Sequence, residues 1–416
     1  MTRRVRRLRR RSPELVDWIN DDAARRATSL EVKPLPAPRL VALDVTLGAR
    51  SDTQSGLQML RPRIWGALHE PAARGHAAAI VMHPASNFMG HYLLAPLAER
   101  GLTALGLNSR YAGNDTMLLM ERVLQDLGAG VRFLHDEGYG QVLLIGNSGG
   151  ASLVSFYAAQ SQRVTATEFA HGGATGLTRD DLPPVQGLVL SAAHLGRSRL
   201  LLDWLDPALT DEAEPLAIDP ALDLYDPRHG PPFDADFLVR FYQAQRARRD
   251  RIEAWVMARL AQLRGTAGAA PDQVFLMHRT HADPRCLDLG LDANDRAAGS
   301  VWGDARAVNQ SANAMGRITS LSGFMSQWSK QSAADGPTSL AACSHPVLLL
   351  THSADQSTFP STRAAWLAAG GARVRDVMLR GATHYLSGQP EHVIRSADEI
   401  AAFAQANAGR PAVARR

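Results

Sequence analysis

The sequence predicts an α/β protein, with a mostly parallel central sheet covered by helices on both faces and a large, mainly helical insertion. Short apolar segments alternate with amphipathic ones over residues 40–191 and again over residues 345–406, the pattern of consecutive strand–helix–strand units. Between these stretches roughly 150 residues lack the alternation, and so long a connection is expected to be a structured unit rather than a plain loop. Within the first stretch, residues 141–160 predict a buried strand that passes through a glycine-rich turn into a helix.

The elements follow in order from the hydrophobic pattern. Short apolar or alternating runs predict strands at residues 40–47, 64–69, 77–82, 103–107, 142–145, 188–191, 346–350 and 374–379. Apolar residues spaced three and four apart predict helices at residues 91–100, 117–137, 151–160, 362–369 and 393–404. In the insertion, a proline- and acid-rich loop at residues 203–232 precedes a long helix at residues 234–263 and a helical piece near residues 317–330.

These elements divide the chain into three parts. Residues 1–36 are an arginine-rich leader that we expect to be disordered. Residues 37–191 and 345–408 are expected to form the α/β core, and residues 192–344 a cap or lid over the ends of the strands. A hydrophobic content of 45% with 21% charged residues is typical of a globular chain with a sizeable core.

The net charge of +4 comes from the ends of the chain. Seven arginines lie in the first eleven residues and three in the last eight, and without these ten the formal charge is about −6. The basic residues are not interleaved with aromatic ones, so nucleic acid is not expected as a partner. No run of 18 apolar residues predicts a membrane span, and no apolar segment follows the arginines as an export signal requires. We therefore expect a cytoplasmic protein that binds no membrane.

The turn at residues 146–150 reads Gly-Asn-Ser-Gly-Gly, a G-x-S-x-G pattern placed between a strand and a helix. Such a turn holds the serine hydroxyl away from the sheet, and its crowded backbone needs small residues two before and two after the serine. Ser148 is therefore the candidate nucleophile. A glycine-rich turn without chemistry and a phosphate-binding turn are the alternatives, although the lysine of a phosphate loop is missing.

A nucleophilic serine needs a base oriented by an acid. His384 follows the last predicted strand directly, and Asp355 lies in the loop after the strand at residues 346–350. Asp355 could instead cap the following helix. Asp203 and Asp304 are weaker candidates for the acid, and His352 is a rival base that precedes Asp355 in the same loop.

The order Ser148, Asp355, His384, each after a predicted strand, resembles that of the α/β-hydrolase superfamily, and the resemblance covers residues 40–191 and 345–406. It implies a serine hydrolase that forms an acyl-enzyme on Ser148. It also implies an oxyanion hole built from the backbone N–H groups of Gly149 and Ala85. Pro84 stands where the family usually has glycine, so Ser86 is an alternative to Ala85 as the second donor.

The expected substrate is a small-molecule carboxylic ester or thioester. A lactone, an amide or a carbon–carbon bond would use the same residues, and a cofactor-free haloperoxidase or a non-catalytic binding protein are alternatives of a different class. Tyr111, Trp302 and Trp328 are candidates for the substrate pocket. Four arginines of the long helix are expected to form a solvated face: Arg246, Arg248, Arg249 and Arg251.

No cofactor or metal is expected. His278, His281, Asp283 and Cys286 lie close in sequence, but their spacing fits no standard zinc site. With only one further cysteine, Cys343, free buried thiols are expected rather than a disulfide framework. The sequence leaves the oligomeric state open.

Overall fold

A computed structural model describes residues 35–45, 63–312 and 314–409. The arginine-rich leader predicted at residues 1–36 lies outside these described residues except for its last two. The end of the first predicted strand, at residues 46–47, lies outside them as well. One compact unit spans Pro36–Arg416.

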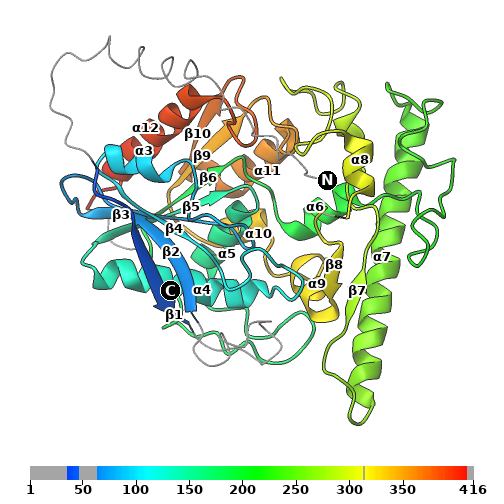
Figure 1. Cartoon of the computed structure of the whole chain (residues 1–416), viewed down its shortest axis with the longest axis horizontal. Coiled ribbons are helices and arrows are strands. Elements are labelled where there is room, and N and C mark those ends of the chain that lie inside the picture. Colours follow the sequence, from blue (N-terminus) through cyan, green and yellow to red (C-terminus); the bar gives the residue numbers. More distant parts are fainter. Residues whose placement is uncertain (1–34, 46–62, 313, 410–416) are drawn as a thin grey trace, which may run out of the picture. The chain divides into compact units, whose positions relative to one another are not determined.

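An eight-stranded sheet forms the core of the unit (Figure 1). Its strands are β1 (Arg39–Asp44), β2 (Arg63–His69), β3 (Ala77–Met82), β4 (Thr103–Leu107), β5 (Gln141–Asn147), β6 (Gly187–Ser191), β9 (Val347–His352) and β10 (Val374–Leu379). They lie in the order β1-β2-β4-β3-β5-β6-β9-β10. β2 pairs antiparallel with β1 and β4, and the other pairs are parallel. The predicted mostly parallel sheet is confirmed.

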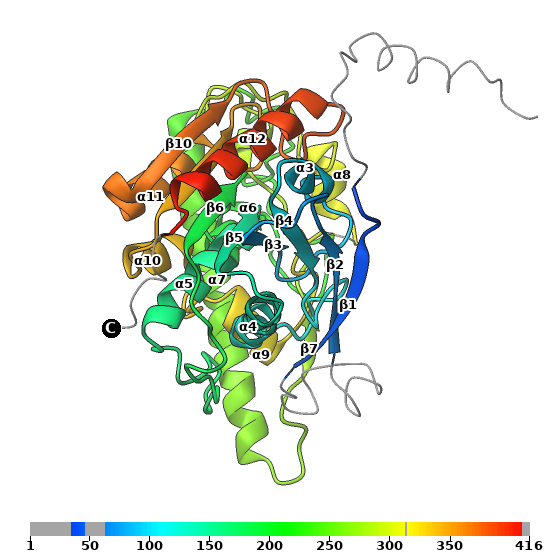
Figure 2. The same ribbon diagram turned by 90° about the vertical axis from the view of Figure 1, so that its left-hand side faces the viewer.

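Helices cover both faces of this sheet (Figure 2). α3 (Leu94–Glu99) and α12 (Pro390–Ala406) pack on one face, and α4 (Met120–Asp136), α5 (Gly150–Gln162), α10 (Gly336–Ala341) and α11 (Pro360–Gly370) pack on the other. Alternate residues of a strand point to opposite faces. Thus Ile80 of β3 joins the apolar cluster with α4 and α5, while Val81 joins the cluster with α3 and α12. The central strand β5 is buried along its whole length for this reason.

A long insertion separates β6 from β9. It contains α6 (Arg197–Trp204), α7 (Ala235–Gly265), β7 (Val274–Leu276), a 3₁₀ turn (Pro284–Cys286), α8 (Ala305–Gln310), β8 (Ile318–Ser320) and α9 (Leu321–Gln327), which lie together beside the sheet in Figure 1. These elements have an apolar cluster of their own, in which Leu201, Val256 and Phe324 are buried. α10 falls within the range predicted for the cap, yet it packs on α5 and α11 of the core.

The long helix of the insertion begins where the sequence predicts. The Asp234 side chain accepts a hydrogen bond from the N–H of Phe237 and so caps α7. The expected solvated face is wrong for one of its four arginines, because Arg248 is fully buried. Its guanidinium donates to the carboxylate of Glu212 and to backbone carbonyls, which satisfy the donors that burial removes from water.

The helix predicted near residues 317–330 is also corrected. Residues 318–320 form β8, which pairs antiparallel with β7. Ile318 and Thr319 are β-branched and favour a strand, and the Ser320 side chain accepts from the N–H of Gly323, which fixes the start of α9. Nothing in the local pattern of residues 317–330 reveals the partner strand, which lies more than forty positions earlier.

Candidate active site

The turn after β5 holds Ser148 in a strained backbone conformation. Its φ angle is +56°, in the left-handed region of backbone conformation that residues other than glycine rarely adopt. The two glycines at Gly146 and Gly150 leave room for backbone atoms that pass close to them. A Cβ added to Gly146 would lie 2.3 Å from the carbonyl oxygen of Gly150, and a Cβ added to Gly150 would lie 2.2 Å from the carbonyl oxygen of Met82. The turn therefore presses against the end of β3 and turns the serine hydroxyl outward.

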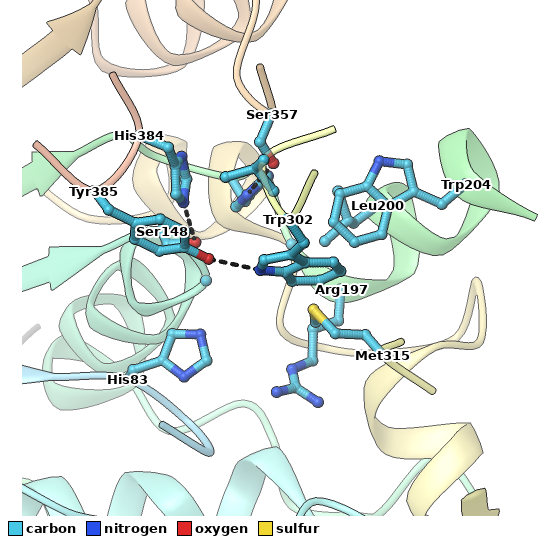
Figure 3. Close-up of a pocket in the computed structure, with 14 residues that line it drawn as sticks. His83, Ser148, Arg197, Leu200, Trp204, Trp302, Met315, Ser357, His384 and Tyr385 are labelled. Atoms are coloured by element: carbon cyan, nitrogen blue, oxygen red, sulfur yellow. Dashed lines mark hydrogen bonds between the residues drawn. The ribbon is translucent and has the colours of Figure 1, made fainter. Parts of the chain in front are cut away.

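Two further functional side chains come from the loops after β10 and β9, which are neighbouring strands. His384, in the loop after β10, places Nε2 3.1 Å from the hydroxyl oxygen of Ser148 (Figure 3). Its Nδ1 lies 2.8 Å from a carboxylate oxygen of Asp355, which follows β9. An imidazole between a hydroxyl and a carboxylate can accept the hydroxyl proton while the carboxylate stabilises the resulting cation. Of the three residues selected in the sequence, His384 thus lies within hydrogen-bond reach of both Ser148 and Asp355.

Asp355 is buried and remains negatively charged. Its carboxylate accepts hydrogen bonds from the N–H groups of Ser357 and Thr358 and from the Thr358 hydroxyl, besides His384. Burial alone would raise the pKa of Asp355. The neighbouring His384 and these hydrogen bonds outweigh burial and hold that pKa well below its ordinary value.

The alternative acids and base have other partners. Asp304 caps α8 by accepting from the N–H of Ala307, and Asp203 pairs with Arg285. Nδ1 of His352 lies 2.8 Å from the carbonyl oxygen of Thr383, and its Nε2 lies 3.3 Å from the hydroxyl oxygen of Ser191. The geometry therefore favours Asp355 and His384 over all three.

A small cavity opens beside Ser148, between the core and the insertion (Figure 3). It offers about 30 Å³ to the centres of water molecules, and one water needs about 10–15 Å³ on this measure. Its polar lining includes Ser148 and His384 of the core and Arg197 of the insertion. Its apolar wall comes from Leu200, Trp204, Val301, Trp302 and Met315 of the insertion. The indole N–H of Trp302 donates to the hydroxyl of Tyr385, at 2.9 Å, and so links the insertion to the residue after His384.

Of the three residues predicted for the substrate pocket, one lines this cavity. Trp302 lines the cavity, but Tyr111 and Trp328 do not. Tyr111 is buried in the cluster between the sheet and α4. Trp328 is buried in the apolar cluster of the insertion, where it packs against the guanidinium of Arg197. Both side chains turn into apolar cores, which the sequence pattern does not distinguish from a pocket wall.

Sequence reasoning missed several cavity residues. His194 lies three residues after β6, and its Nε2 is 3.0 Å from the hydroxyl of Ser357. Its position after a parallel strand is the signal that could have revealed it, because the carboxyl ends of such strands gather at one edge of the sheet. Arg197, Leu200 and Met315 also line the cavity, and they come from the insertion, where no such rule applies.

The loop after β3 differs from the predicted oxyanion loop. The N–H groups of Ala85 and Ser86 both donate to Nδ1 of His83, at 3.1 and 2.9 Å. Both amides that the sequence offers as the second oxyanion donor thus point at an imidazole. Among the described residues, no hydrogen bond engages the N–H of Gly149, the first predicted donor.

In residues 35–45, 63–312 and 314–409, no group of three or more His, Cys, Asp or Glu side chains is arranged to hold a metal ion. The same ranges contain no helix with the length and apolar character needed to cross a bilayer. Cys286 and Cys343 are free and buried.

Several histidines of the structure are buried with lowered pKa values. Burial is the main cause, because it disfavours the charged imidazolium. It lowers the pKa of His194 to about 3 and that of His91, His281, His345 and His352 to about 4. Neither ring nitrogen of His281 has a hydrogen-bond partner in the described chain.

We expect the free energy of unfolding to fall as the pH is lowered from about 6.5 to 4. In this pH window a histidine of the unfolded chain binds a proton, whereas the same histidine buried in the folded protein does not. Each of the five buried histidines therefore contributes stability that is fully present above pH 6.5 and is lost as the pH falls toward its folded-state pKa. The slope is about 1.4 kcal/mol per pH unit for each such histidine. Urea unfolding at pH 7 and pH 5 measures it. His281→Phe removes one such histidine and should reduce the slope of the unfolding free energy against pH by about 1.4 kcal/mol per pH unit. An unchanged slope would contradict the lowered pKa of His281.

Comparisons with known proteins address the fold. No protein-family model matches the chain, and no curated protein matches it. Among solved structures, that of DcsB in complex with its substrate analogue matches with a TM-score of 0.50 and 13% identity, over 89% of this chain and 99% of that one. The esterase domain of a Rhodothermus marinus protein matches with a TM-score of 0.45 and 14% identity, over 89% and 99%. Est1E from Butyrivibrio proteoclasticus matches with a TM-score of 0.42 and 13% identity, over 88% of this chain and 99% of that one.

The fold is that of the α/β-hydrolases. The sheet order, the antiparallel β2, the serine turn after the central β5 and the helices on both faces agree with it. At identities this low, the likeness concerns the fold alone, and the reaction has to be argued from the site itself.

Proposed function

We propose that this α/β-hydrolase-fold protein is a serine hydrolase that cleaves small carboxylic esters through an acyl-enzyme on Ser148. The observation that carries the proposal is the chain of two hydrogen bonds from Ser148 through His384 to Asp355. His384 takes the hydroxyl proton as Ser148 attacks the acyl carbon, and Asp355 stabilises the imidazolium. His384 then returns the proton to the leaving alcohol, and a water molecule releases the acid by the same steps in reverse.

The cavity supports a short acyl group. A space of about 30 Å³ for water-sized centres holds two or three small groups, comparable with an acetyl or propionyl chain. Its apolar wall would favour an unbranched alkyl group over a charged one. A thioester with a short acyl chain would be cleaved by the same three residues and is the second candidate substrate.

A series of p-nitrophenyl esters with two to twelve acyl carbons tests this proposal. We expect kcat/KM to be highest for acyl chains of two to four carbons and to fall by at least about tenfold at eight, because a longer chain meets the wall of Leu200 and Trp204. Absence of hydrolysis across the whole series would contradict the proposal.

Two neighbouring leucines of α6 provide a matched pair for the size argument. Leu200 lines the cavity, whereas Leu201 is buried in the apolar cluster of the insertion and does not. Leu200→Ala should shift the preferred ester toward longer chains. Leu201→Ala should lower the free energy of unfolding by about 2–5 kcal/mol without shifting the preference. Equal shifts in both variants would show that the cavity wall does not set acyl size.

A further inference from the structure

Two donors are expected in the oxyanion hole, but of the three backbone N–H groups that the sequence offers for it, one has no hydrogen-bond partner within the described part of the chain. The N–H of Gly149 is available, but those of Ala85 and Ser86 are committed to Nδ1 of His83. A developing oxyanion needs donors already in place, and the loss of one costs about 10²–10³-fold in kcat. The question is which group of this chain takes the second position.

Those same two hydrogen bonds fix the state of the His83 ring. An N–H group donates only to a nitrogen that carries a lone pair, so Nδ1 is unprotonated. The neutral ring must then carry its proton on Nε2. Burial lowers the pKa of His83 well below its ordinary value, and the charge of Arg197 lowers it further, so the ring stays neutral at neutral pH. Nε2–H is therefore a hydrogen-bond donor.

That donor lies over the serine turn. His83 lines the cavity together with Ser148 and Gly149, and Figure 3 shows its ring beside Ser148. A Cβ added to Gly149 would lie 2.8 Å from Nε2 of His83. Gly149 has a φ of −62° and a ψ of −15°, which any residue can adopt, so its backbone does not require glycine. What glycine provides here is room for the imidazole.

We propose that His83 is a catalytic residue whose Nε2–H is the second oxyanion donor, in place of the backbone amide predicted at Ala85. The inference rests on the proposed ester hydrolysis. As the bond between the Ser148 oxygen and the acyl carbon forms, the carbonyl π pair moves to its oxygen and the serine proton passes to His384. The oxygen then accepts hydrogen bonds from the N–H of Gly149 and from Nε2–H of His83. His83 transfers no proton and is unchanged at the end of the cycle.

Two substitutions separate this role from a purely structural one. The Asn side chain in His83→Asn can accept from the N–H groups two and three residues on, as Nδ1 does, but it has no group at the place of Nε2. The longer Gln side chain in His83→Gln can place an N–H donor near that position without holding the loop. We expect kcat for p-nitrophenyl acetate to fall about 10²–10³-fold in His83→Asn with KM within a few fold, and His83→Gln to recover at least about tenfold of that loss.

Binding of a trifluoromethyl ketone provides a second readout, because its adduct with serine carries the oxyanion. Its affinity should fall in His83→Asn by the same factor as kcat. In the wild-type protein, ¹H–¹⁵N NMR of the ring should show the proton on Nε2 at pH 7. A ring protonated on Nδ1 would overturn the inference whether or not the variants fold.

The outcomes distinguish this inference from the function on which it rests. Wild-type activity that depends on Ser148 but is unchanged in His83→Asn would overturn the role of His83 alone. Higher activity in His83→Asn than in His83→Gln would also overturn it, since that pattern means that the ring only holds the loop. A wild-type protein that hydrolyses no ester would overturn both proposals.

Discussion

Replacing Ser148 by alanine is expected to lower kcat for p-nitrophenyl acetate by about 10⁶-fold, the scale seen when the nucleophile of a serine hydrolase is removed. The substitution deletes the oxygen that lies 3.1 Å from Nε2 of His384 and leaves no atom to form the acyl-enzyme. The fold should tolerate it, because the hydroxyl is not buried in the core and the backbone bond from Ser148 N–H to the carbonyl of Ser191 remains. Steady-state kinetics with a thermal unfolding curve measures both effects.

Ser191 provides the matched control. Its hydroxyl also lies next to a histidine, 3.3 Å from Nε2 of His352, but it is buried and does not line the cavity. Ser191→Ala keeps the backbone carbonyl that Ser148 uses and should retain activity within a few fold. A large loss in Ser191→Ala together with near-normal turnover in Ser148→Ala would exchange the assigned roles.

His384→Ala should reduce kcat almost as much as the loss of the serine, about 10⁴–10⁶-fold, because triad residues act as a unit. Without the imidazole, the hydroxyl has no base within reach, and Asp355 keeps a buried charge that only Ser357 and Thr358 satisfy. We therefore expect a measurable loss of stability as well. Hydrolysis and unfolding measured on one preparation separate the two effects.

The control for this variant is the rival base. His352→Asn removes an imidazole, while the asparagine amide can still donate to the carbonyl of Thr383 as Nδ1 does. Activity should stay within about tenfold of the wild type. Retained turnover in His384→Ala, or a loss in His352→Asn as large as that in His384→Ala, would remove His384 from its assigned role.

The sequence was sufficient for the core of the fold because the core obeys local rules. The run Val142 to Ile145 is uniformly apolar and bounded by glycine, and it became the buried centre of β5. The stripe that predicts the long helix at residues 117–137 is buried on α4 as expected. Each of these signals lies within one segment, so no knowledge of distant contacts is required to interpret it.

The insertion was less predictable because its elements depend on partners far along the chain. β8 is a strand only because β7 lies beside it, and Arg248 is buried only because Glu212 and three carbonyl groups surround it. The residues that wall the cavity, such as Leu200 and Met315, have no motif. They acquire their place from the packing of the insertion against the core, which composition and periodicity do not encode.

The oxyanion loop shows why a motif predicts a site better than it predicts each atom in it. The sequence placed His83 and Ala85 directly after β3, and the structure agrees. Of the two, His83 lines the cavity with Ser148. Which of their N–H groups is free depends on hydrogen bonds within the loop. The N–H of Ala85 is directed at the His83 ring, and a family pattern cannot anticipate that result.

The most direct test of the central claim is covalent labelling with a fluorophosphonate, followed by intact-mass measurement and peptide mapping. If Ser148 is the activated nucleophile, the wild-type protein should gain one adduct per chain, on the peptide that contains Ser148, and Ser148→Ala should gain none. A folded wild-type protein that resists labelling, or an adduct that persists in Ser148→Ala, would contradict the account.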